Sequence, residues 1–110
     1  ITGRVIADGG DGNDRLDAQP LVQTAVSLVG GIGNDTLRGG SQADIVDGGD
    51  NDDSITGGLG ADNIAGGNGA DLIFGDHPLS ENLPINSASL GSDTIAGGMG
   101  NDTIYGDSDG

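Results

Sequence analysis

Apolar and polar residues alternate in a pattern that recurs every nine positions along most of the chain. In each unit one large aliphatic residue is the middle residue of a three-residue segment, and an Asp lies two positions before it. The aliphatic residues are Leu16, Leu37, Val46, Ile55, Ile64, Ile73, Ile95 and Ile104. Three residues with the aliphatic side chain on one face suit a short strand. A Gly pair every nine residues disfavours helix, so the pattern predicts a series of three-residue strands.

The six residues before each strand follow the pattern Gly-Gly-x-Gly-x-Asp. Gly, Asn and Asp tolerate positive φ, so these residues predict a turn. Position four departs from Gly at Gln42 and Asn51, and we expect distorted turns there. One unit is split, because residues 77–89 are inserted between Gly75–Asp76 and Leu90–Ala96.

Nine residues of turn and strand suffice for half a coil, so two units are expected to make an 18-residue rung. Stacked rungs give an all-β solenoid with two facing parallel sheets and the aliphatic residues between them. Successive units then alternate between the sheets. One column is expected to hold Leu37, Ile55, Ile73 and Ile104, and the facing column Val46, Ile64 and Ile95.

The whole chain, 1–110, is interpreted as one segment of such a solenoid. Its expected parts are an isolated repeat at 9–17, an irregular rung at 18–29, regular repeats at 30–76 and 90–107, and the insertion at 77–89. In the irregular rung, Val26 stands where Asp is expected and Leu28 supplies the strand, and Ile1–Asp8 is expected to do the same. The chain starts at Ile1 without Met and closes on Gly106–Asp107, the beginning of another unit. We therefore expect a piece of a longer polypeptide.

Composition restricts the function. Among 110 residues there are 24 Gly, 18 acidic residues and 3 Lys or Arg, which gives a formal net charge of −15. Such a chain will not bind nucleic acid or anionic lipid, and it has no apolar run that could span a membrane. The absence of Cys excludes disulfides and thiolate chemistry. The charge and the scarcity of aromatic residues approach the composition of disordered chains, so folding requires something that offsets the repulsion.

The recurring Asp residues indicate what that is. Strands in a sheet lie about 4.8 Å apart, so stacked units would hold a ladder of repelling carboxylates. A hard divalent cation cancels this repulsion, and calcium accepts many oxygen ligands in irregular geometry. We expect about five or six calcium ions between same-side turns. The expected ligands are the carboxylates of Asp14, Asp35, Asp44, Asp53, Asp62, Asp71, Asp93 and Asp102, and carbonyls of Gly31, Gly33, Gly40, Gly49, Gly58, Gly60, Gly67, Gly69, Gly98 and Gly100.

The consensus Gly-Gly-x-Gly-x-Asp-x-aliphatic-x resembles the repeats-in-toxin (RTX) calcium-binding nonapeptide, over 9–17, 30–76 and 90–107. The resemblance implies a parallel β-roll with calcium between turn i and turn i+2, held by Asp carboxylates and main-chain oxygens. It also implies bacterial secretion, an extracellular or cell-surface location, and folding on calcium binding outside the cell. Three roles stay open: a structural spacer, the C-terminal part of a secreted protease or lipase, and an adhesive ligand-binding module.

Other interpretations of the same residues are weaker. An EF-hand needs a Glu at the end of its loop, and Glu81 is the only Glu. His77 is the only His and has no evident catalytic partners, so we expect no enzyme activity. The insertion is apolar at Leu79, Leu83 and Ile85, and we expect it to cover Phe74 and Tyr105, which alternation makes cross-strand neighbours. The alternative is a loop that recognises a ligand.

Overall fold

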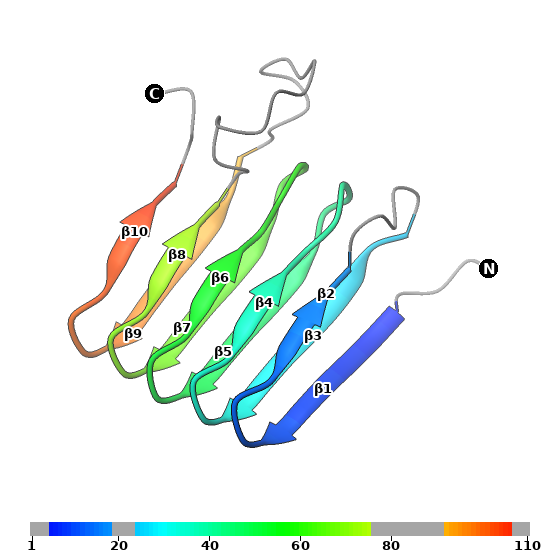
Figure 1. Cartoon of the computed structure of the whole chain (residues 1–110). Helices are drawn as coiled ribbons and strands as arrows, with labels where there is room; N and C mark the ends of the chain where they lie inside the picture. The colour runs from blue at the N-terminus through cyan, green and yellow to red at the C-terminus, as the bar shows by residue number, and fades with distance from the viewer. Residues whose placement is uncertain (1–4, 19–23, 76–91, 107–110) are drawn as a thin grey trace.

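The computed structural model describes residues 5–18, 24–75 and 92–106. Over these residues the chain forms ten strands in two five-stranded parallel sheets. Consecutive strands lie in opposite sheets, and each strand pairs with the next but one (Figure 1). This confirms the all-β solenoid of two parallel sheets.

The two sheets differ in strand length. The long-strand sheet contains β1 (Val5–Asp11), β3 (Val26–Ile32), β5 (Ile45–Asp50), β7 (Asn63–Asn68) and β9 (Thr94–Met99), in that order. The short-strand sheet contains β2 (Arg15–Asp17), β4 (Thr36–Arg38), β6 (Ser54–Thr56), β8 (Leu72–Phe74) and β10 (Thr103–Tyr105). Only the short-strand sheet has the three-residue strands that the sequence pattern predicts.

In the long-strand sheet the strand continues through the Gly pair that was expected to belong to the turn. The second Gly of each pair has a positive φ, 106° at Gly31, 106° at Gly49 and 105° at Gly67. These glycines nevertheless pair with one another across the rungs, Gly31 with Gly49 and Gly49 with Gly67. A residue with a side chain is strained at this φ, so Gly allows the strand to extend here.

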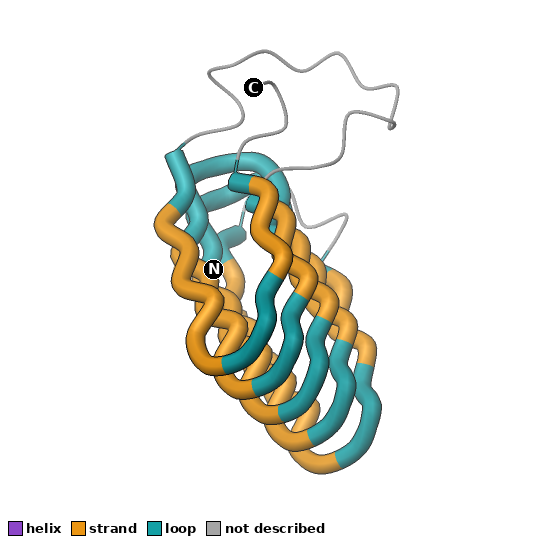
Figure 2. The backbone as a smooth tube through the Cα atoms, turned by 90° about the vertical axis from the view of Figure 1, so that its left-hand side faces the viewer, coloured by secondary structure: helices purple, strands orange, loops and turns teal. Residues whose placement is uncertain are grey.

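The rungs stack in register despite their unequal lengths. Residues in equivalent places on successive rungs are 18 apart where repeats are uninterrupted, 21 apart across the irregular segment and 31 apart across the insertion. The tube in Figure 2 shows the strands on two sides of each coil with loops between them. The extra residues therefore leave the register of the stack unchanged.

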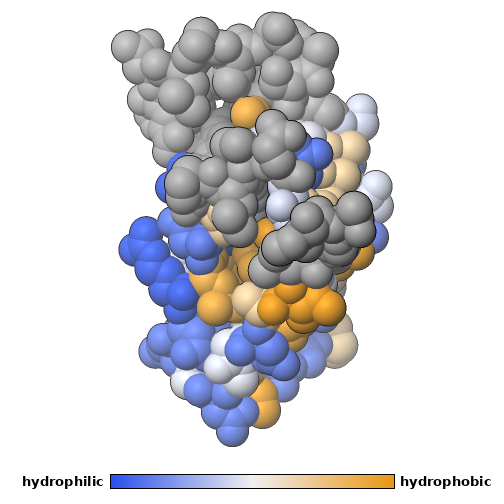
Figure 3. All heavy atoms as spheres, turned by 90° about the vertical axis from the view of Figure 1, so that its right-hand side faces the viewer, coloured by the Kyte–Doolittle hydropathy of each residue, from blue (hydrophilic) through white to orange (hydrophobic). Residues whose placement is uncertain are grey.

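The core lies between the sheets and consists of the predicted aliphatic columns. Leu37, Ile55 and Ile73 stack on one side, and Val46 and Ile64 on the other. All five are at most 1 % exposed. Ile104, which joins the first column in the edge strand β10, is 44 % exposed. Figure 3 looks onto the opposite end, where hydrophobic atoms lie between hydrophilic edges.

The irregular segments supply strands as the alternation predicts. Leu28 stacks on Val46, and β1 pairs with β3 so that Ala7 stacks on Leu28. Val26 N donates to Asp44 Oδ1 at 2.9 Å, the bond that an Asp N–H makes elsewhere in the stack. Val26 thus occupies the place of an Asp backbone without supplying a carboxylate. The insertion 77–89 lies outside the described residues.

Phe74 and Tyr105 are cross-strand neighbours on the outer surface of the short-strand sheet, as predicted. Their rings stack with centroids 5.0 Å apart and an interplanar angle of 9°. Tyr105 remains 54 % exposed and Leu72, on the same face, 38 %. The expected cover for these rings belongs to the insertion, so this expectation stays a prediction.

Candidate metal sites

The position-six Asp residues lie in two rows at opposite edges of the solenoid. The turns that lead into the short-strand sheet carry Asp14, Asp35, Asp53, Asp71 and Asp102. The turns that lead into the long-strand sheet carry Asp44, Asp62 and Asp93. Both rows agree with the predicted alternation, and Asp14 joins the first row across the irregular segment.

Most of these carboxylates are buried. Asp35, Asp44, Asp53, Asp62 and Asp71 are between 1 % and 3 % exposed. Asp14, Asp93 and Asp102 are half-buried because each ends its row. Asp44 also begins a row, yet the rung that contains Val26 covers it.

In every Asp of the two rows except Asp14, one carboxylate oxygen accepts a hydrogen bond from the rung before it. The backbone N–H of one Asp donates to Oδ1 of the next Asp in its row, and this bond repeats with nearly constant length. The pairs are Asp14–Asp35 and Asp35–Asp53 at 2.8 Å, Asp44–Asp62, Asp53–Asp71 and Asp62–Asp93 at 2.9 Å, and Asp71–Asp102 at 3.0 Å. Six pairs of neighbouring Asp residues are therefore held in fixed register. Asp35 has partners on both sides, since Asp14 supplies the one upstream.

The other oxygen faces a second acceptor. Oδ2 of Asp14, Asp35, Asp53 and Asp71 is buried and accepts no hydrogen bond within the protein. A Cβ placed on Gly9 would lie 2.7 Å from Asp14 Oδ2 and 2.8 Å from the carbonyl oxygen of Gly30. The same pairing of Oδ2 with a carbonyl one rung later recurs around Gly30, Gly48 and Gly66. Two acceptors that converge without a proton donor repel each other, and either a bound cation or a proton on the carboxyl relieves that repulsion.

Burial has an electrostatic consequence for this row. The pKa of Asp53 rises from 3.8 to about 6, mainly because the carboxyl is desolvated and further because of the charges of Asp71, Asp35 and Asp52; the Asp35 N–H opposes the rise. The pKa of Asp71 is raised for the same main reason, with Asp102 and Asp52 adding and the Asp53 N–H opposing. Ionised carboxylates in this row therefore need an electropositive partner.

The donor set suits calcium. Among the described residues no three His, Cys, Asp or Glu side chains gather to hold a metal by themselves. Any ion between two rungs must therefore combine carboxylates with backbone carbonyls, and an all-oxygen set of variable geometry is the kind that calcium accepts. The residues present thus fit the ion that the sequence indicates.

The carbonyls that face the Asp Oδ2 atoms across these Gly positions belong to glycines that sequence reasoning missed. They are the first glycines of the repeats, such as Gly30, Gly48 and Gly66. Carbonyls at position two also lie along the stack: a Cβ on Gly49 would meet Gly31 O, and one on Gly67 would meet Gly49 O. The expectation that glycines at positions two and four are ligands stays a prediction. The sequence feature that could have indicated these carbonyls is the Gly at position one of every unit.

The two departures from Gly at position four behave differently. Asn51 has a φ of 83° and keeps the left-handed conformation, and its Oδ1 accepts from Gly33 N at 3.1 Å. The expected distortion is therefore absent at Asn51. In the turn that contains Gln42, neither Gly40 nor Gln42 has a positive φ, whereas Gly58 and Gly60 do in the equivalent turn of the next rung. The expected distortion is present there.

A parallel β-solenoid with rows of buried carboxylates between its turns defines a class of cation-binding repeat proteins. A family model described as the RTX calcium-binding nonapeptide repeat matches in four copies, over residues 2–19, 27–55, 47–76 and 87–110. The chain belongs to this family. Its repeats are thus calcium-binding RTX repeats in a β-roll.

Searches of curated proteins and of solved structures each returned no significant match. Over the residues that the structure describes, no helix is long and apolar enough to cross a membrane. No catalytic domain is evident, since a calcium-binding repeat module is all that is identified. The family is typical of secreted bacterial proteins.

Proposed function

We propose that this chain holds six calcium ions, one between each pair of neighbouring Asp residues in a row. The pairs are Asp14/Asp35, Asp35/Asp53, Asp53/Asp71, Asp71/Asp102, Asp44/Asp62 and Asp62/Asp93. The observation that carries the proposal is the buried Oδ2 of Asp14, Asp35, Asp53 and Asp71, which faces a Gly carbonyl with no donor between them. The pairs in the other row are proposed by equivalence of position, and there Asp44 Oδ2 accepts from Gly40 N at 2.7 Å. The first glycines of the repeats join the expected carbonyls at positions two and four as ligands. We expect dissociation constants of about 10⁻⁴–10⁻³ M, as in other extracellular calcium modules.

Calcium binding and folding are then one equilibrium. A formal charge of −15 and buried, desolvated carboxylates oppose the apo fold, while the core consists of two thin aliphatic columns. Without calcium the chain stays unfolded, because its buried surface does not offset its ordering entropy and its repulsion. With calcium the rows are neutralised and the rungs stack.

The module serves as a non-enzymatic, stabilising or spacer part of a secreted or surface-exposed bacterial protein. Support comes from the repeats, which extend through most of the chain, and from the family to which they belong. The alternatives are the C-terminal part of a secreted protease or lipase, and an adhesive module that uses its insertion. The sequence of the full-length polypeptide discriminates between them, because an enzyme host would carry a catalytic motif upstream.

Isothermal titration calorimetry with calcium, followed in parallel by circular dichroism, tests the calcium sites. We expect binding of about six ions together with a gain of strand signal. Asp62→Asn removes a carboxylate from two sites and should lose about two ions, whereas Asp47→Asn, at an exposed Asp outside both rows, should lose none. No binding at several millimolar calcium, or equal losses in both variants, would contradict the proposal.

A further inference from the structure

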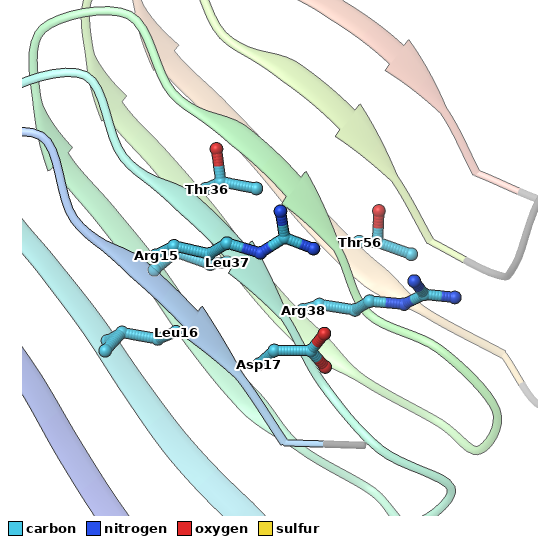
Figure 4. A pocket seen from close by; sticks show the side chains of 7 residues that line it. All are labelled: Arg15, Leu16, Asp17, Thr36, Leu37, Arg38 and Thr56. Atoms are coloured by element: carbon cyan, nitrogen blue, oxygen red, sulfur yellow. The ribbon is translucent and has the colours of Figure 1, made fainter. Parts of the chain in front are cut away.

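The outer surface of the short-strand sheet contains a groove that the calcium sites do not use. It has a volume of about 190 Å³ and is lined on this surface by Arg15, Asp17, Thr36, Arg38 and Thr56. In Figure 4 both Arg side chains extend in the same direction, and Leu16 extends away from them toward the other side of the sheet. The polar part of the groove therefore lies on the outside of the solenoid, and Leu16 and Leu37 of the same strands also line it.

Strand register brings the two guanidinium groups to this groove. Arg15 on β2 lies opposite Thr36 on β4, and Asp17 lies opposite Arg38. Thr56 follows in the same row as Arg38, one strand further. Arg15 and Arg38 are thus diagonal neighbours on one face, a separation that long side chains bridge.

This placement is unusual in so acidic a protein. The chain has three Lys or Arg residues in total, and Arg15 and Arg38 are the two that the described residues contain. Both line one groove. A guanidinium presents a planar fork of donors that matches a carboxylate, and the Thr hydroxyls and the Asp17 carboxylate add groups that bind hydroxyls.

We propose that this groove binds a hydroxy-carboxylate, with the acid group on the guanidinium groups of Arg15 and Arg38 and the hydroxyls on Asp17, Thr36 and Thr56. A volume of about 190 Å³ is many times the roughly 10–15 Å³ that one water molecule needs, so the groove has room for a small organic acid. The acid is either free or carried on a polymer.

Binding depends on calcium, and in this respect it rests on the proposed function. Arg15 directly follows Asp14, and Thr36 directly follows Asp35. The calcium ion proposed between Asp14 and Asp35 therefore fixes the register of the two strands that form the groove. Six calcium ions would also change the formal net charge from −15 to −3, which removes most of the long-range repulsion toward an anion.

The test is an NMR titration of the ¹⁵N-labelled chain in 10 mM calcium. Lactate is the free-acid probe, glycerol the neutral control and carboxymethyl-dextran the polymer-borne acid. Lactate should shift the side-chain Nε–H signals of Arg15 and Arg38, and glycerol should not. Response to carboxymethyl-dextran but not to lactate would support the proposal and assign the acid to a polymer.

Variants separate recognition from folding. Arg15→Gln/Arg38→Gln should weaken binding of the acid at least about tenfold, which is about 1.4 kcal/mol. Ala65→Gln puts the same side chain on the outer face of the long-strand sheet and should bind as the parent does. Circular dichroism in calcium checks that each variant is folded.

Two outcomes would overturn the proposal. One is a folded parent chain that responds to neither acid, which leaves the calcium proposal intact. The other is an equal response in the double Gln variant and the parent. A chain that stays unfolded in calcium would overturn the proposed function as well, and circular dichroism identifies that case without any acid present.

Discussion

Replacing Asp53 by Asn should change stability in opposite directions with and without calcium. Oδ1 of Asp53 accepts from Asp35 N at 2.8 Å, and Asn keeps this acceptor. Oδ2 faces the carbonyl of Gly66 across the position of Gly48, and the Nδ2 of Asn would donate to that carbonyl. Without an ion, Asn therefore supplies the donor that the native carboxylate lacks. With calcium, the same change removes a charged ligand from two sites.

The magnitudes follow from burial and from mass action. The rise of the Asp53 pKa to about 6 corresponds to at most about 3 kcal/mol at neutral pH, and to about 1–2 kcal/mol after allowance for solvent screening. Asn should stabilise the apo fold by that smaller amount. At 10 mM calcium and a dissociation constant of about 10⁻⁴–10⁻³ M, each site contributes roughly 1.4–2.7 kcal/mol. Loss of two sites should therefore cost roughly 3–5 kcal/mol.

The assay compares the two conditions directly. Because the apo chain is expected to be unfolded, its folding is induced with trimethylamine oxide, and Asp53→Asn should fold at a lower concentration than the parent. In 10 mM calcium, urea denaturation followed by circular dichroism should show a lower midpoint. Asp102→Asn is the matched control, since Asp102 ends its row and should lose one site. A loss of stability in both conditions, or equal losses for the two variants in calcium, would refute the reasoning.

Three further outcomes are expected. Circular dichroism of the parent chain should change from disordered to strand-rich on addition of millimolar calcium, and a spectrum rich in strand without calcium would contradict the coupling of folding to binding. Calcium affinity should fall as pH decreases through about 6, because a proton competes with calcium for the Asp53 carboxylate. The calcium-free fold should gain stability over the same pH range, because the folded state binds that proton more tightly than the unfolded state does. Calorimetry at pH 7.5 and 5.5 measures the difference, and unchanged affinity would show that Asp53 is not a ligand. Gly67→Ala should destabilise the calcium form more than Gly10→Ala, because both glycines have positive φ but a Cβ meets the Gly49 carbonyl at Gly67 and nothing within 4 Å at Gly10. Urea midpoints measure this, and equal losses would assign the cost to φ alone.

The repeat pattern predicts a large part of this fold because each nonapeptide supplies one turn, one strand and one Asp at fixed positions. One aliphatic residue two positions after an Asp fixes a strand face and a turn together, so the columns of Leu37, Ile55 and Ile73 and of Val46 and Ile64 follow from spacing alone. Alternation of units also predicts that Phe74 lies beside Tyr105. The same spacing predicts which Asp residues face one another.

The sequence could not predict features that depend on how two rungs meet. The Gly pair reads as turn in every unit, yet in one sheet it continues the strand, because Gly31 and Gly49 pair across rungs while keeping a positive φ. The carbonyls that face the Asp Oδ2 atoms come from the first glycine of the next rung, a relationship between residues 13 apart for Asp35 and Gly48. Likewise, Asp14 gains its place in the row through an irregular rung without a consensus motif.

Sequence by itself thus determined the period, the alternation and the chemistry of this protein, because these depend on residue type at a fixed spacing. Tertiary structure alone decided strand length, the carbonyls that face the buried carboxylates and the diagonal placement of Arg15 and Arg38 on one face, because these depend on the register between rungs. Register is a property of the stack: each rung is aligned by its hydrogen bonds to the rung beside it, and no single nonapeptide contains that information.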